Sequence, residues 1–171
     1  LSDFEIIPTH PFCYWAPRQV RQAFTRYQKL EPDYGIVRKG LSPGNSPRFV
    51  RYRWEVPPGR VDMRWWAPYA NGGSFSPYFR DNTSVVLWRN DGEAVKAIRP
   101  KSVLRSEKLY GESGLTYGKR HHLLNIQFLE EGHVFSNEGY IVRCKAQYKE
   151  AQLAALLNSA VLRFAVNLMS G

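Results

Sequence analysis

Apolar side chains recur at helical spacing near both ends of the chain. Near the amino terminus the set follows Pro17 and consists of Val20, Phe24, Tyr27 and Leu30. Near the carboxyl terminus a broader stripe begins after about Lys149 and comprises Leu153, Leu156, Leu157, Ala160, Val161, Phe164 and Leu168. Proline suits an early helical position, and steps of three or four residues place side chains on one helical face. The pattern predicts a helix at each end.

Between these helices the chain consists of short apolar stretches separated by Gly, Pro and Asn, a pattern typical of strands and loops. The predicted strands cover residues 48–56, 83–88, 124–128, 132–135 and 140–145. A β-rich centre of mixed or antiparallel strands, flanked by an N-terminal and a C-terminal helix, predicts an α+β fold. We expect residues 1–171 to form a single domain.

Charge adds the first functional indication. The 24 Lys and Arg residues against 15 Asp and Glu residues give a net charge of +9 and a pI near 9.7. Such a surface attracts polyanions. Aromatic residues make up 14% of the chain, and their rings suit either a packed core or stacking on bases.

The cysteines and the chain ends indicate the setting. Cys13 and Cys144 form no C-x-x-C pair, so a reducing compartment is expected. No apolar run approaches the roughly 20 residues of a membrane span, and we expect a soluble protein with no membrane partner. The chain begins at Leu1 rather than Met and stops at Gly171 just after a helical run. We therefore expect a fragment of a longer protein.

The sequence offers little evidence of a metal site. Glu93 and Lys96 are separated by two residues, whereas the common metal-nuclease signature separates such a pair by one. A zinc site built from His121, His122, His133 and Cys144 has no familiar spacing. We predict no metal ligands, and exposed histidines are the simpler interpretation.

Seven segments carry a resemblance to a known family. They are IIPTHPFCYW at 6–15, KGLSPGNSPRF at 39–49, RWEV at 53–56, WAPYANGGSF at 66–75, VLWRNDG at 86–92, GLTY at 114–117 and LLNS at 156–159. In order and spacing they resemble the C-terminal region of Type IIG-like and BREX-type (PglX-like) adenine-specific DNA methyltransferases. The chain departs from the family pattern at Ser42-Pro43, Asn71 and Tyr117, where the family commonly has Thr, Lys and Trp.

The resemblance implies a TaqI-like target-recognition domain that reads DNA, located after the catalytic and cofactor motifs of its parent enzyme. The parent would use S-adenosylmethionine to methylate the amino group of a flipped adenine. The chain lacks the required Asn/Asp/Ser-Pro-Pro-aromatic loop, and its nearest string, SPYF at 76–79, has one proline. It also lacks a glycine-rich cofactor loop. We therefore predict no catalytic residue and no cofactor in this fragment.

The expected partners are double-stranded DNA and the catalytic methyltransferase domain of the same parent chain. The system would be restriction-modification or phage defence in a bacterial or archaeal cytoplasm. Two other functions stay open: a metal-dependent nuclease domain, and a protein-interaction domain that docks a defence-complex subunit through the terminal apolar stripe.

Candidate DNA-binding residues fall into two groups. Basic side chains suited to phosphate contacts are Arg18, Arg21, Lys39, Arg48 and Arg51. Loops suited to base contacts contain Ser42, Asn45, Asn71, Ser74, Tyr78, Arg80, Tyr117, Lys119, Arg120, His121 and His122. The alternatives are a merely solvated basic face and, for Asn45, a hydrogen bond to its own backbone. Trp65 and Trp66 are expected to be core residues rather than contacts.

Overall fold

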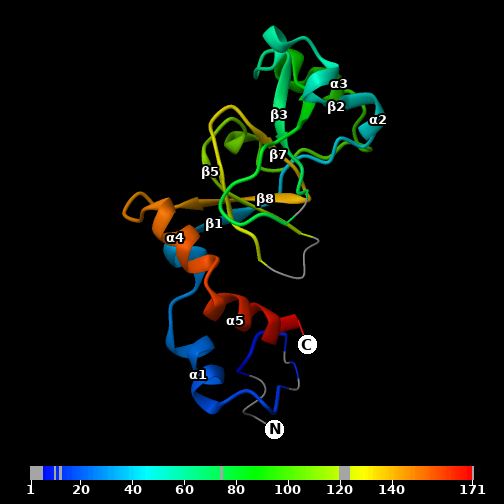
Figure 1. Ribbon diagram of the computed structural model, residues 1–171. Helices are drawn as coiled ribbons and strands as arrows, with labels where there is room; N and C mark the ends of the chain where they lie inside the picture. Colours follow the sequence, from blue (N-terminus) through cyan, green and yellow to red (C-terminus); the bar gives the residue numbers. More distant parts are fainter. Residues whose placement is uncertain (1–5, 10, 12, 74, 120–123, 171) are drawn as a thin grey trace.

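Two four-stranded sheets occupy the middle of the molecule in the computed structural model (Figure 1). The structure describes residues 6–9, 11, 13–73, 75–119 and 124–170. The first sheet is antiparallel, in the order β1 (Gly35–Arg38), β8 (Gly139–Cys144), β5 (Gly114–Gly118) and β6 (Gln127–Leu129). The second has the order β2 (Val50–Tyr52), β4 (Ser84–Leu87), β3 (Trp66–Ala70) and β7 (Val134–Phe135), with only β3 and β7 parallel.

Within the described ranges, five helices pack around the sheets and at the two ends of the molecule. They are α1 (Arg18–Arg26), α2 (Ser46–Phe49), α3 (Arg89–Lys96), α4 (Glu150–Leu157) and α5 (Ala160–Ser170). Single turns occur at η2 (Leu30–Tyr34), η3 (Arg53–Glu55), η4 (Pro58–Arg60) and η5 (Glu107–Leu109). In Figure 1, α1 and α5 lie at one end of the molecule and α2 and α3 at the other, with the sheets between. The α+β prediction is confirmed.

Separate apolar clusters stabilise these parts. Trp88, Phe49 and Val95 pack between the second sheet and the helices α2 and α3. The apolar face of α4 packs on the first sheet, where Leu153 and Leu157 join a cluster of buried strand residues. A third cluster links the amino-terminal segment and α1 to the end of α5.

A fourth cluster joins the two sheets. Ala70 and Phe135 come from the second sheet, and Leu129 and Ile141 come from the first. The chain itself also crosses here, because residues 136–138 connect β7 to β8. The junction between the sheets is therefore a packed, continuous part of the fold.

A helix is present near each end, as predicted, but α1 ends at Arg26, before the predicted positions Tyr27 and Leu30. The second predicted helix is broken. It divides into α4 and α5, which are bent by 61° at Asn158-Ser159. Among the described residues no single helix has the length and apolar character to cross a membrane, and only this bent pair together passes on length and composition.

Four predicted strands are present as β4, β6, β7 and β8, with bounds shifted by up to three residues. The predicted strand 48–56 is wrong outside Val50–Tyr52. Its start is part of α2, and the Glu55 carboxylate accepts the Tyr52 N–H at 2.6 Å and turns the chain into η3. A local cap and a local turn interrupt the apolar pattern that suggested one strand.

The pattern missed β1, β3, β5 and α3. Strand β3 contains Pro68, which normally argues against a central strand. Pro68 pairs with Val85 of β4, whereas the β7 ladder starts one residue later at Tyr69. The missing N–H of Pro68 thus falls outside the paired part of that ladder.

Candidate functional site

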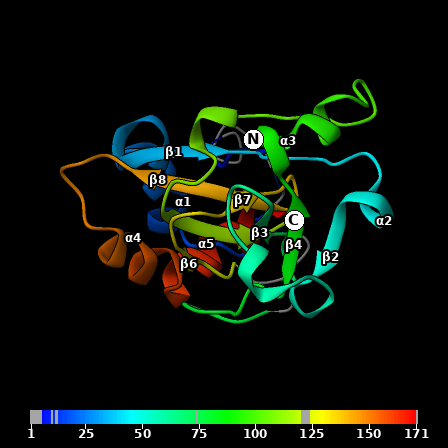
Figure 2. The same ribbon diagram turned by 90° about the horizontal axis from the view of Figure 1, so that it is seen from above.

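A polar hollow of about 550 Å³ opens at the junction of the two sheets. Three segments line it: the loop 42–47, the end of β3 and the β7–β8 connection. The lining residues are Ser42, Pro43, Gly44, Asn45, Ser46, Pro47, Tyr69, Asn71, Asn137 and Glu138. Seen from above, the connection from β1 to α2 runs along the outside of the molecule, and β3 and β7 lie nearer its middle (Figure 2). The hollow brings together the predicted residues Ser42, Asn45 and Asn71.

One carbonyl group ties the three walls together. The Leu41 carbonyl oxygen accepts the Tyr69 hydroxyl at 3.1 Å and the Asn137 backbone N–H at 3.0 Å. Burial raises the pKa of Tyr69 well above its ordinary value, so this hydroxyl remains a donor. The Ser136 hydroxyl in turn accepts the N–H groups of Glu138 and Gly139 at 2.9 and 2.8 Å. The walls of the hollow are thus positioned before any ligand binds.

The loop 42–47 is fixed by close backbone contacts. Ser42 and Val103 exchange two backbone hydrogen bonds of 2.8 Å. A Cβ at Gly40 would lie 1.9 Å from the carbonyl oxygen of Phe135, so that position excludes a side chain. Gly44 has φ +70°, and a Cβ there would lie 2.5 Å from the backbone of Lys101. Glycine is required at both positions for different reasons.

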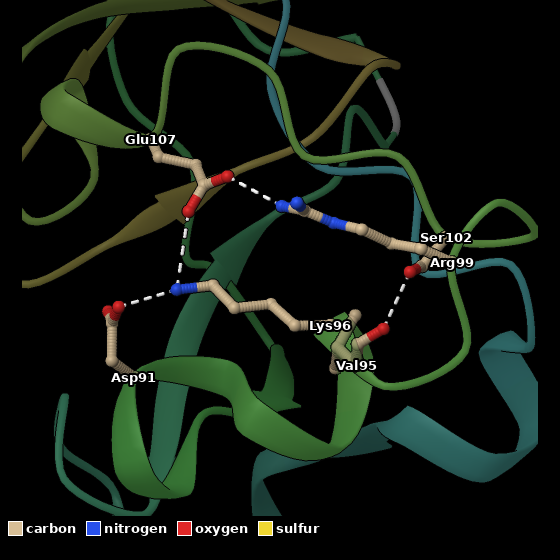
Figure 3. Close-up of polar contacts among 6 residues, drawn as sticks. All are labelled: Asp91, Val95, Lys96, Arg99, Ser102 and Glu107. Carbon is tan, nitrogen blue, oxygen red and sulfur yellow. Dashed lines mark hydrogen bonds and ion pairs between the residues drawn. The ribbon is translucent and has the colours of Figure 1, made fainter.

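Segment 97–107, which pairs with this loop through Val103, is held by hydrogen bonds and ion pairs to α3 and within itself (Figure 3). The Ser102 hydroxyl donates to the Val95 carbonyl of α3 at 2.5 Å. The Glu107 carboxylate lies 3.2 Å from the Lys96 ammonium and 2.7 Å from the Arg99 guanidinium. Lys96 also pairs with Asp91 at 2.5 Å, and these hydrogen bonds to carboxylates raise its pKa. The ion pairs close the segment that carries Val103.

Asn45 has two uses in this site. Its side-chain oxygen accepts the Arg48 N–H at 3.1 Å and caps α2. The hydrogen bond to local backbone, one of the two interpretations of this residue, is therefore present. The cap uses only the carbonyl oxygen, and Asn45 is an exposed residue in the lining of the hollow, so its NH₂ group is not needed for the cap.

Basic and aromatic side chains border the hollow along the first sheet. The Lys39 ammonium lies 5.6 Å from the Tyr140 ring centroid, and Tyr140 lies 5.4 Å from Tyr117, its partner on β5. Burial and the neighbouring Tyr140 raise the pKa of Tyr117 to about 12. The Lys119 N–H donates to the Glu138 carbonyl at 2.9 Å, which attaches this row to the wall of the hollow.

Other candidate residues are partly engaged by the protein itself. Arg51 donates to the carbonyls of Pro47 and Val50 at 2.6 and 2.7 Å. The Arg48 guanidinium lies 5.0 Å from the Phe49 ring. Arg80 is half-buried against Gly73, where an added Cβ would lie 2.2 Å from its Nη1 atom, and desolvation lowers its pKa. Tyr78 is exposed beside β6, with φ +71°.

The predicted basic group does not gather on one face. Arg18 and Arg21 lie on α1, at the end of the molecule opposite α2 (Figure 1). Ser74, Arg120, His121 and His122 lie outside the described residues. In the described ranges no group of three or more His, Cys, Asp or Glu residues could hold a metal ion.

Asn137 and Glu138 were missed by the sequence analysis. They lie in the string SNEG at 136–139, a turn pattern between two apolar stretches that could have marked them as surface residues. Their place in the hollow depends on β7 and β8 belonging to different sheets.

Comparison with known proteins adds a relative. No protein-family model matches the chain. The adenine-specific methyltransferase PglX of Lacticaseibacillus casei (strain Zhang) is 26% identical over 125 residues, which covers 66% of this chain and 10% of the relative. The chain thus spans about a tenth of the length of the protein that it matches. By this similarity the chain is related to an adenine-specific methyltransferase.

Proposed function

We propose that this chain is a DNA target-recognition module that gives sequence specificity to an adenine-specific DNA methyltransferase of a restriction-modification or phage-defence system. The main support is the convergence of Ser42, Asn45 and Asn71, far apart in the sequence, on one polar hollow. The relative supplies the link to adenine-specific methylation. The TaqI-like assignment belongs to this proposal.

The hollow has the chemistry of a base reader. Asn45, Asn71 and Asn137 each carry a carboxamide, which donates and accepts at once and can pair with the N6 and N7 edge of adenine. Glu138 adds an acceptor of the kind that pairs with the cytosine amino group. These groups stand on a framework already fixed by hydrogen bonds, which limits the entropy lost on binding.

Positive charge supplies the remaining affinity. Lys39 and Lys119 are exposed at the border of the hollow, where they can reach phosphates on either side of a bound duplex. Arg18 and Arg21 lie on the distant α1, and we assign them to general attraction of DNA rather than to base contacts.

Methyl transfer belongs to the rest of the parent chain in this proposal. S-adenosylmethionine needs a glycine-rich loop between a strand and a helix, and the sequence contains none of that kind. Exposed apolar side chains on α4 and α5, among them Leu156, Val161 and Phe164, offer a surface for the catalytic domain. We place the parent in a bacterial or archaeal cytoplasm.

Duplex binding and the methylation map test the proposal together. Fluorescence anisotropy with a labelled duplex library should show binding by the purified chain without S-adenosylmethionine. In the parent enzyme, Asn71→Ala should alter which sites are methylated, because a good base contact contributes about 1–3 kcal/mol of discrimination. Asn167→Ala removes an equally exposed amide from α5 and should leave the map unchanged.

Arg21→Ala should weaken binding to all sequences alike. No duplex binding by the wild-type chain, or a methylation map that changes with Arg21→Ala but not with the Asn variants, would refute the assignment.

A further inference from the structure

Two arginine side chains lie against one tryptophan, Trp65, at the far end of β3 from the hollow. The Arg60 guanidinium carbon lies 4.7 Å from the Trp65 ring centroid, and that of Arg89 lies 4.9 Å from the same point. The two guanidinium groups are therefore less than about 10 Å apart. Both arginines are exposed, and Trp65 is half-buried. The indole orients both cations through its π face.

The nearby carboxylates are engaged elsewhere. Asp62 accepts the side chain of Arg64 and the backbone N–H groups of Arg64 and Trp65. Asp91 pairs with Lys96, and Glu93 accepts the side-chain amide of Asn90 at 2.9 Å. Within the part of the chain that the structure describes, neither Arg60 nor Arg89 has an ion pair with a carboxylate.

The backbone holds Arg89 in place. The Trp88 N–H donates to the Trp65 carbonyl at 2.7 Å, which joins the start of α3 to the start of β3. Asn90, Asp91 and Gly92 then all have positive φ, and a Cβ at Gly92 would lie 2.8 Å from the Trp88 ring. The turn packs on the buried Trp88, so the backbone at Arg89 is held beside Trp65.

We infer that Arg60 and Arg89 form a binding site for a phosphate oxyanion beside Trp65. Two neighbouring cations without a carboxylate repel each other, and an anion that both contact removes this repulsion. The guanidinium fork matches two phosphate oxygens, and the indole restricts the rotamers of both side chains before binding. The phosphate source that we assign is the DNA backbone, a step that rests on the proposed function.

Geometry relates this site to the hollow. Trp65 and Asn71 lie just outside the two ends of β3, so six residue steps of about 3.3 Å separate them by at most about 20 Å. This length equals about six steps of 3.4 Å along a DNA strand. A bound duplex is therefore long enough to span the base reader and the phosphate site.

The salt dependence of duplex binding tests the site. Between about 50 and 200 mM salt, the slope of log affinity against log salt falls by about 0.9 for each lost phosphate contact. We expect the double variant Arg60→Gln/Arg89→Gln to lower the slope by about 1, because the two arginines hold one phosphate. Its duplex affinity at low salt should fall about tenfold. The control Lys108→Gln/Lys145→Gln removes the same charge from exposed positions elsewhere and should change the slope much less.

A titration of the purified chain with inorganic tripolyphosphate distinguishes the two sources of phosphate, the DNA backbone and a free polyphosphate. We expect the wild-type chain to bind tripolyphosphate more weakly than duplex DNA. The Arg60→Gln/Arg89→Gln variant should bind both ligands more weakly than wild type does. An unchanged slope in that variant, with duplex binding still sensitive to Asn71→Ala, overturns the phosphate site and leaves the proposed function intact. If the wild-type chain binds no duplex, the proposed function fails, and the tripolyphosphate titration then tests the anion site alone. Loss of tripolyphosphate binding in the Arg60→Gln/Arg89→Gln variant supports the site. Equal binding by the variant and wild type overturns it.

Discussion

Asn158 forms both of its amide hydrogen bonds with the backbone of Ile126, 32 residues away in the sequence. Its oxygen accepts the Ile126 N–H at 2.9 Å, and its nitrogen donates to the Ile126 carbonyl at 2.8 Å. Both residues are buried. The side chain pairs with residue 126 as a neighbouring strand would, just where α4 ends, and so fixes the C-terminal helices against the first sheet.

Replacing Asn158 should therefore destabilise the fold. Asn158→Ala leaves the buried Ile126 N–H without a partner, whereas the Ile126 carbonyl still accepts the Tyr78 N–H at 3.0 Å. We expect the free energy of unfolding to fall by about 1–3 kcal/mol. Urea denaturation followed by circular dichroism measures this. Asn167→Ala, at an exposed position on α5, should cost less than about 0.5 kcal/mol. Equal losses in the two variants would show that the Ile126 pairing contributes nothing.

Gly44 should tolerate no side chain. Gly44→Ala places a Cβ 2.5 Å from the Lys101 backbone at φ +70°. We expect a loss of about 1–3 kcal/mol from backbone strain, with a further loss from the clash. Gly59→Ala is the matched control, because a Cβ at Gly59 meets no atom within 4 Å. A thermal melt of both variants checks this, and a stable Gly44→Ala protein would contradict the described loop.

The two uses of Asn45 can be separated by substitution. Asn45→Asp keeps an oxygen for the Arg48 N–H but loses the NH₂ donor, whereas Asn45→Ala loses both. The Ala variant should lose about 1 kcal/mol of stability through the missing cap, and the Asp variant should lose little. Both should change the methylation map of the parent. A map unchanged by Asn45→Asp would mean that only the cap matters.

The Glu107 ion pairs should have a small, salt-dependent effect. The three side chains are 29–52% exposed, so water and salt screen the pairs. Glu107→Gln should lower the free energy of unfolding by about 1 kcal/mol or less at low salt, and by less in 1 M salt. Denaturation at both salt concentrations measures the difference. A loss that grows with salt would exclude an ion-pair origin.

Stability should fall at alkaline pH. The pKa of Tyr117 is raised to about 12, and that of Tyr69 is raised further by burial, so the folded state favours the neutral phenols. The stability that the two buried phenols contribute is fully present below their unfolded-state pKa of about 10. It is lost as the pH rises through the folded-state pKa. Unfolding free energies measured between pH 9 and about 12 should decline. Tyr117→Phe should reduce this decline in stability. A decline in the variant as steep as in wild type, or steeper, would contradict the role of Tyr117.

Local spacing was enough to predict several elements. Helix α1 follows from apolar positions three to four residues apart, which share one face of a helix, and strand β4 follows from a short apolar run. The broken C-terminal helix was beyond this reasoning. Residues 153–168 form one continuous apolar stripe, and the break occurs where Asn158 pairs with a distant backbone.

The candidate site, too, could be predicted from the sequence only in part. Ser42, Asn45 and Asn71 were predicted because glycine-rich polar loops are recognisable within a few residues. Their meeting in one hollow, the addition of Asn137, and the distance of Arg18 from all of them depend on which strands pair and on where the chain changes sheets. Pairing of this kind links residues far apart in the sequence. No local pattern encodes it, and only the folded chain brings these side chains together.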